Sequence, residues 1–212
     1  MWTDFVDLVY MTLFSVSTAL GGSMGWAIAV VSFVTRLVLL PITLRMAYRG
    51  LEVQAALSRL APALKGIREK HKKDQHRIAQ ETAALYQANG IQLVDSGSLV
   101  GLALQAPIFL GLFEAIRRGL AAGGRFLWVR DLGVPDGLLA LGCAVITAWS
   151  SALAPNLPES QRVPAIVLPA LLTLVFLSRM AAGIGIYSLS SGLVGLGQAV
   201  LVRRRAMRGI TA

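Results

Sequence analysis

The sequence predicts an all-α integral membrane protein with five transmembrane helices, on three observations. Hydrophobic residues make up 55% of the 212 residues and charged residues only 15%, and the mean hydropathy is +0.65. The apolar residues gather in five runs of membrane-spanning character. Most of the basic residues behind the net charge of +9 lie between these runs, where they orient a membrane chain rather than bind nucleic acid.

Residues 1–25 predict a helix on the membrane surface followed by a turn. Four apolar residues recur on one side of this helix: Trp2, Phe5, Val9 and Leu13. The turn is Gly-Gly-Ser-Met-Gly at 21–25, which also matches the G-x-S-x-G pattern of a serine nucleophile. That motif needs a preceding strand and a histidine within reach, so we interpret the glycines as a helix break.

The first span, residues 26–45, carries Arg36 near its middle. The rise of a helix puts Arg36 about 15 Å from Trp26 and about 13 Å from Arg45, close to mid-membrane. A guanidinium at that depth costs from about 3 kcal/mol to about 10 kcal/mol or more, and arginine does not lose its charge. We therefore expect Arg36 to face a wet cavity inside the bundle, and this cavity to be the working site.

Several polar residues fall at the depth of Arg36 or on helix stripes that could line the same cavity. They are Ser32, Thr35 and Thr43 on the first span, Gln105 on the second, Thr147, Ser150 and Ser151 on the third, and Ser188, Ser191, Gly195 and Gln198 on the fifth. For the serines and glycines, close helix packing is an equally good explanation. Glu114 has Arg117 and Arg118 at i+3 and i+4, so we expect it to pair with them and not with Arg36.

Residues 46–96 predict a helical hairpin in water. One helix carries an apolar seam at Val53, Leu57, Leu60, Leu64 and Ile67, and the second carries a matching face at Ile78, Thr82, Leu85 and Tyr86. Asp74 is the expected cap of the second helix, and Asn89-Gly90 its end. His71 and His76 are expected to be solvated.

Four further apolar runs follow within residues 97–202: 98–115, 137–154, 163–177 and 181–202. Each can span a bilayer, the fourth only marginally. With five spans, one face holds the Lys and Arg residues of three segments: nine in 45–96, one in 155–163 and four in 203–212. The other face holds five. The positive-inside rule therefore puts the hairpin and the basic tail, 203–212, in the cytoplasm and the N-terminus outside.

Enzymatic function is not indicated. Both histidines lie in the hairpin and the single cysteine, Cys143, lies in an apolar run, so we expect no catalytic site, no metal site and no cofactor. Two alternatives stay open: a small-solute membrane transporter and a structural subunit of a membrane complex. The transporter is the weaker one, because it calls for inverted repeats and interrupted helices, the sequence shows no repeat, and the hairpin would be unexplained.

Five blocks resemble the YidC/Oxa-type membrane protein insertases. They are GWAIAVVSFVTRLVLLPIT, the hairpin end ETAALYQANGI, LQAPIFLGLFEAI in the second span, FLWVRDLGVPD on the outside, and GIGIYSLSSG in the last span. The resemblance covers nearly the whole chain. It departs from the family at Asp95-Ser96-Gly97-Ser98, where proline is missing, and at Tyr187-Ser188, where tryptophan often follows the tyrosine.

The resemblance implies an insertase and chaperone of the prokaryotic plasma membrane, with a groove open to the cytoplasm and to lipid. Arg36 takes the place of the groove arginine, and Gln105 and Pro107 that of the Gln-x-Pro of the second span. Candidates for an apolar wall along which a client slides are Leu104, Ile108, Leu112 and Phe176. The implied partners are nascent membrane proteins, with a ribosome or anionic lipid at the basic tail and a Sec translocon as further candidates.

Overall fold

The computed structural model describes residues 2–71, 74–91, 107, 110, 111, 113, 114, 116–118, 126–155 and 159–210, without the side chains of 159–161 and 209–210. Within them the chain forms helices α1 (Trp2–Ala19), α2 (Met24–Lys70), α3 (Gln75–Ala88), α5 (Gly137–Ala152), α6 (Glu159–Leu177) and α7 (Ala182–Ile210). The chain divides into two compact units, residues 1–42 with 104–212 and residues 43–103.

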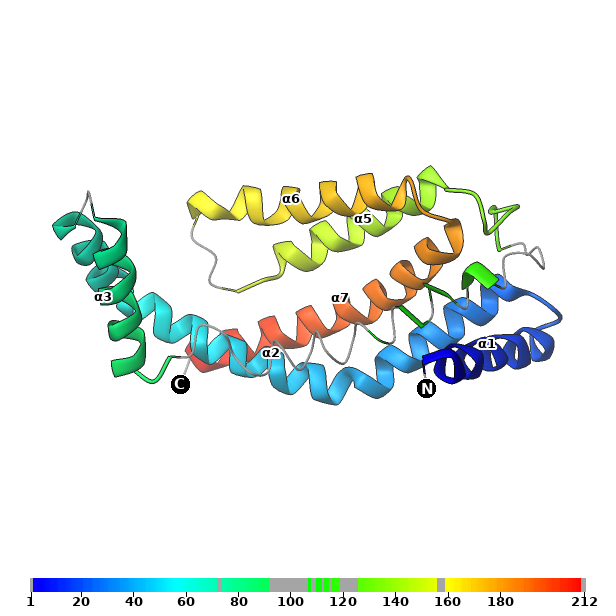
Figure 1. Ribbon diagram of the computed structural model, residues 1–212, viewed down its shortest axis with the longest axis horizontal. Coiled ribbons are helices and arrows are strands. Elements are labelled where there is room, and N and C mark those ends of the chain that lie inside the picture. The colour runs from blue at the N-terminus through cyan, green and yellow to red at the C-terminus, as the bar shows by residue number, and fades with distance from the viewer. Residues whose placement is uncertain are drawn as a thin grey trace. The chain divides into compact units, whose positions relative to one another are not determined.

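In the first unit, α5 and α6 form an antiparallel pair and α7 packs along α5 (Figure 1). The N-terminal ends of α2, α5 and α7 meet at one end of this unit, in an apolar cluster that we call the closed end. Its buried members are Leu13, Met24, Ala27, Ile28, Ile116, Phe126, Val129, Leu132, Leu139, Ala182, Ile186 and Tyr187. The three helices therefore run in the same direction away from the closed end.

Local sequence explains why helices start and stop there. α1 ends in a Schellman motif, in which Gly21 and Gly22 have positive φ and the Gly22 N–H donates to the Ser17 carbonyl. The Ser23 hydroxyl then accepts from the Trp26 N–H at the start of α2. The helix break predicted at 21–25 is confirmed at Gly21 to Ser23, whereas Met24 and Gly25 already belong to α2, and Ser23 acts as a helix cap.

Two polar contacts connect residues 126–136 to the helices of the closed end. The Asp136 carboxylate accepts from the Leu139 N–H at 2.7 Å and so caps α5. The carbonyls of Leu132 and Val134 accept from the first N–H groups of α7. Backbone groups left over at two helix starts are thereby satisfied, which fixes α5 and α7 side by side.

The predicted apolar side of α1 is confirmed at three of its four residues. Leu13 is buried in the closed end, Val9 packs against it, and Phe5 contacts Gly111, whereas Trp2 is half exposed. Val6 and Ser17, which the prediction did not name, are also buried. Leu8, Met11 and Phe14 stay exposed on its other side.

Three helix limits also differ from the prediction. α2 runs unbroken through the expected boundary at 45, although the two compact units divide between Ile42 and Thr43. α6 begins at Glu159, before the expected 163, and α7 continues through the basic tail to Ile210. Polar residues at a helix end extend the helix beyond the apolar run, so hydropathy alone underestimates helix length.

Two of the described helical stretches are long and apolar enough to cross a membrane, 24–70 and 182–208, and two shorter apolar ones cover 137–152 and 162–177. Most of the predicted second span lies outside the described residues. The count of five spans stays a prediction.

In the second unit, each residue of the predicted seam and matching face is partly buried, while the residues around them are mostly exposed. The Asp74 carboxylate accepts from the Arg77 N–H at 3.0 Å, as expected of a cap. Gly90 has φ +66 and completes a Schellman motif through the Ile91 N–H. The expectation that His71 is solvated is wrong: it is 13% exposed, with Nε2 2.8 Å from a Glu81 carboxylate oxygen.

Candidate functional site

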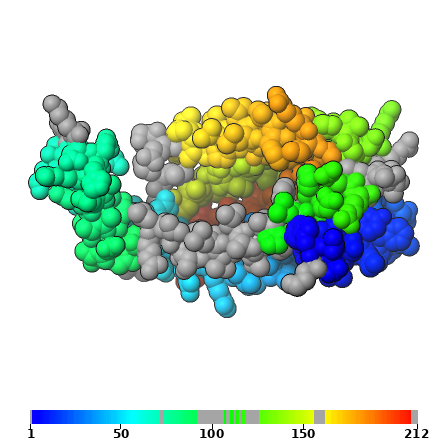
Figure 2. Space-filling view, in the orientation of Figure 1, coloured from blue at the N-terminus to red at the C-terminus, as the bar shows by residue number. Residues whose placement is uncertain are grey.

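A cavity of about 320 Å³ lies between α2, α5 and α7 in the first unit. Its lining is mostly polar or small: Arg36, Ile146, Thr147, Ser150, Ser151, Ser191, Gly192, Gly195 and Gln198. Figure 2 shows a hollow in the molecular surface in which atoms of α5 and α7 are visible. Arg36 thus shares one cavity with polar residues from two other helices.

Helix periodicity explains this lining. On α5 the lining residues recur at i, i+1, i+4 and i+5 from Ile146, and on α7 at i, i+1, i+4 and i+7 from Ser191. Each set forms one stripe, and α5 packs against α7 so that the two stripes face the same space. A polar stripe on each of two neighbouring helices therefore produces a polar cavity.

The cavity begins one to two helical turns beyond the closed end. Arg36 lies eight residues after Ile28 on α2, and Ser191 lies five residues after Ile186 on α7. At about 1.5 Å per residue, these separations are about 12 Å and about 8 Å. The apolar cluster of the closed end, which we also call the plug, therefore blocks the cavity at that end.

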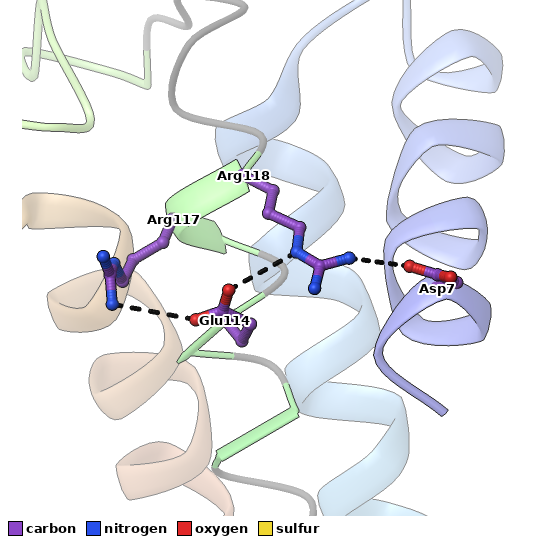
Figure 3. A network of polar contacts seen from close by, with 4 residues as sticks. All are labelled: Asp7, Glu114, Arg117 and Arg118. Carbon is purple, nitrogen blue, oxygen red and sulfur yellow. Dashed lines mark hydrogen bonds and ion pairs between the residues drawn. The ribbon is translucent and has the colours of Figure 1, made fainter. Parts of the chain in front are cut away.

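Arg36 itself is half-buried and has an interaction partner within the protein. Glu114, which the sequence excluded as that partner, lies 3.7 Å from Arg117 and 3.4 Å from Arg118 between charged atoms, which confirms the predicted pairing. Figure 3 shows that Arg118 also reaches Asp7 of α1, at 2.7 Å. No sequence pattern predicted this contact, because its two residues are 111 positions apart.

Two glycines of α7, Gly192 and Gly195, line the cavity. A methyl group on Gly192 would lie 3.1 Å from Ile146, so this glycine also permits close contact between α7 and α5. A methyl group on Gly195 would meet no atom within 4 Å. Of the two explanations that the sequence left open for Gly195, the structure therefore favours cavity lining.

On α5, Thr147 joins the cavity to α6. Its hydroxyl donates to the Cys143 carbonyl at 2.9 Å, and Thr173 of α6 approaches it at 3.5 Å, oxygen to oxygen. Thr173 was not among the predicted site residues, although an isolated hydroxyl within an apolar run was a usable signal.

Several predicted site residues do not line this cavity. Ser32 is buried and donates to the Ile28 carbonyl of its own helix. Thr35 and Ser188 are partly buried outside the lining, and Thr43 belongs to the second unit. Of the predicted apolar wall, Phe176 is 50% exposed. Gln105, Leu104, Ile108 and Leu112 lie outside the described residues.

Outside this cavity the helices present apolar side chains to their surroundings. The exposed large apolar residues of α5 and α6 are Leu138, Leu141, Val145, Trp149, Val163, Val167, Leu168, Leu171, Leu172, Val175 and Phe176. Two other cavities on this unit, of about 280 and 390 Å³, are lined almost entirely by apolar side chains. An exposed apolar surface of this extent is typical of helices in lipid.

The chain is similar in sequence to a family of bacterial membrane proteins. The model of a family described as 60Kd inner membrane protein matches residues 15–209. The membrane protein insertase YidC of Clostridium tetani is 29% identical over 209 residues, which cover 95% of this chain and 91% of that relative. The YidC of Helicobacter pylori strain 26695 is 25% identical over 188 residues, 86% of this chain, and this match spans only 33% of that relative.

The fold has a counterpart among solved structures. A crystal structure of an active YidC insertase with its first transmembrane domain resolved superposes with a TM-score of 0.65 at 24% identity, covering 92% of this chain and 45% of that one. The protein therefore belongs to the YidC/Oxa-type family of membrane protein insertases.

Proposed function

We propose that this protein is a membrane protein insertase in which the Arg36 cavity receives the polar tail of a client. The observation that carries the proposal is the cavity itself, a polar space with a permanent cation in its wall, on helices whose outer surface is apolar. Such a space is costly in a membrane and is retained where a function needs it.

The mechanism follows from the cost of moving a polar tail through hydrocarbon. A cavity that lets the tail enter partway shortens the apolar distance that remains to be crossed. A client carboxylate about 4 Å from Arg36 gains about 4 kcal/mol at an effective dielectric constant of about 20, against about 1 kcal/mol in bulk water. The cavity therefore favours acidic tails over neutral ones of equal length.

The driving force comes from the client. Each apolar side chain of a client helix that leaves water gains about 1.5–3 kcal/mol, and the membrane potential acts on a negative tail in the same direction. The exposed apolar face that includes Phe176 offers a surface along which that helix can move into lipid. The proposed cycle uses no nucleotide.

In the proposed orientation the closed end faces the outside and the second unit lies in the cytoplasm. This agrees with the distribution of Lys and Arg residues and with the common direction of α2, α5 and α7. The hairpin of α2 and α3 then meets the client first. The basic end of α7 then contacts anionic lipid or ribosomal RNA through four arginines: Arg203, Arg204, Arg205 and Arg208.

Substitution of Arg36 tests the proposal. In vesicles containing only this protein, Arg36→Ala should lower insertion of single-span clients with acidic tails by about tenfold, the equivalent of about 1.4 kcal/mol. Arg36→Lys should lower it less, because it keeps the charge. Protection of the client tail from added protease measures insertion.

A matched control is Arg45→Ala, which removes the same charge from an exposed position of the same helix. It should insert the same clients at the wild-type rate. Equal insertion by wild type and Arg36→Ala, with both proteins folded, would contradict the role of Arg36 in the cavity.

A further inference from the structure

The ion pair between Asp7 and Arg118 joins α1 to the helical residues before 118 (Figure 3). Arg118 lies 2.7 Å from Asp7 and 3.4 Å from Glu114, and Glu114 also pairs with Arg117. The side chains of Asp7 and Arg118 are 53% and 43% exposed. An exposed pair of this kind contributes little stability and exchanges readily with other ions.

The same two elements also touch through an apolar contact. The Phe5 ring of α1 packs so closely on Gly111 that a methyl group there would overlap it. The next residue, Val6, is fully buried, and Leu13, about two turns further along α1, is part of the closed end. α1 therefore covers the apolar plug, and the Asp7–Arg118 pair lies at the edge of this cover.

α1 is the element of the closed end whose displacement would change the cavity least. α2, α5 and α7 begin in the plug and continue along the cavity, so that moving them would change the cavity itself. Within the described part of the chain, none of the residues that line the cavity belongs to α1, which packs on the plug through Val9 and Leu13 and is followed by the turn with Gly21 and Gly22 in positive φ. In the proposed function a client tail leaves the cavity on this side, where α1 covers the plug.

We propose that the Asp7–Arg118 pair is a latch that holds α1 over the closed end, and that an acidic client tail opens it by competing for Arg118. This inference rests on the proposed insertase function and orientation. A client carboxylate that replaces Asp7 on Arg118 exchanges one ion pair for an equivalent one. Acidic tails therefore meet a lower barrier at the exit than neutral tails.

Cross-linking tests whether the latch must open. In a Cys143→Ala background, Asp7→Cys and Arg118→Cys are joined by a reversible bifunctional methanethiosulfonate whose arm matches the two side chains. Clients should still photo-cross-link to a probe at Ser191 in the cavity, but their tails should stay open to protease. Cleavage of the linker with a reductant should restore protection.

The control places the same linker between Glu114→Cys and Arg117→Cys, which lie within one helical turn and so join no two elements. Insertion by this variant should be the same with its linker intact and after the linker is cleaved. If client tails become protected from protease at the same rate with the Asp7–Arg118 linker intact and cleaved, the latch proposal is wrong. A parent protein that inserts no client with or without linker would instead refute the proposed function.

Competition by the tail is tested with Asp7→Asn. Removal of the carboxylate should speed the insertion of clients with neutral tails. The preference for acidic over neutral tails should therefore fall by about two- to fivefold, the range that the free energy of an exposed ion pair supplies. Asp4→Asn, one turn earlier on α1, should keep the wild-type preference. An unchanged preference in Asp7→Asn would overturn the competition of acidic tails for Arg118.

Discussion

At the scale of single residues, two glycines of α7 offer a direct test of the cavity. A side chain added at Gly195 would enter the cavity, whereas one added at Gly197 would point to open space beside an exposed backbone. Both substitutions raise helix propensity by the same amount. They differ only in what the new side chain fills.

We expect Gly195→Leu to reduce client insertion several-fold and Gly197→Leu to leave it unchanged. The physical reason is that an apolar side chain displaces water from around Arg36 and narrows the space for a client tail. Both variants should be at least as stable to heat as the wild type, because an added Cβ meets no atom within 4 Å at either position and helix propensity rises. Equal insertion by the two variants would show that the client does not use this cavity.

Residue-scale features were predicted well where the signal is local. Glu114 pairs with Arg117 and Arg118 because residues three and four apart share a helix face, and this spacing is visible in the sequence. Asp7 reaches Arg118 only because α1 packs beside it. Contacts of this second kind depend on tertiary packing and leave no periodic signal.

At the scale of elements, the hairpin of the second unit follows from its sequence pattern. The apolar seam, the Asp74 cap and the glycine at the end of α3 were each predicted and are each present. His71 was placed wrongly because a histidine in a charged segment usually faces water. Here Glu81 of α3 accompanies it, and only the folded hairpin brings the two together.

The end of α3 can be tested with a pair of glycine substitutions. Gly90 has φ +66, so Gly90→Ala should destabilise the helix end by about 1–2 kcal/mol. Gly66 lies inside α2 with nothing within 4 Å of an added methyl group, so Gly66→Ala should stabilise by about 0.5–1 kcal/mol. Hydrogen exchange of the α3 and α2 backbone amides measures both effects. Exchange in α3 should become faster with Gly90→Ala and should not become faster with Gly66→Ala.

At the scale of the whole molecule, the direction of the chain through the membrane is the main prediction. Single cysteines at Thr3 and at Gln75, in a Cys143→Ala background, report on the N-terminus and the hairpin. A membrane-impermeant maleimide added to intact cells should label Thr3→Cys and should reach Gln75→Cys only after permeabilisation. The reason is the greater number of Lys and Arg residues on the hairpin side. Labelling of Gln75→Cys in intact cells would reverse the proposed orientation.

The sequence by itself determined the helical membrane class, the hairpin, the helix break at Gly21 to Ser23 and the cation in the first span. These features depend on hydropathy, periodicity and capping, which act over a few residues. The tertiary structure alone decided that Ser191, Gly195 and Gln198 share a cavity with Arg36 while Ser32 and Ser188 do not, and that α1 lies against Arg118. Which face of a helix meets another depends on how side chains of several helices interlock, and that information is spread over the whole chain.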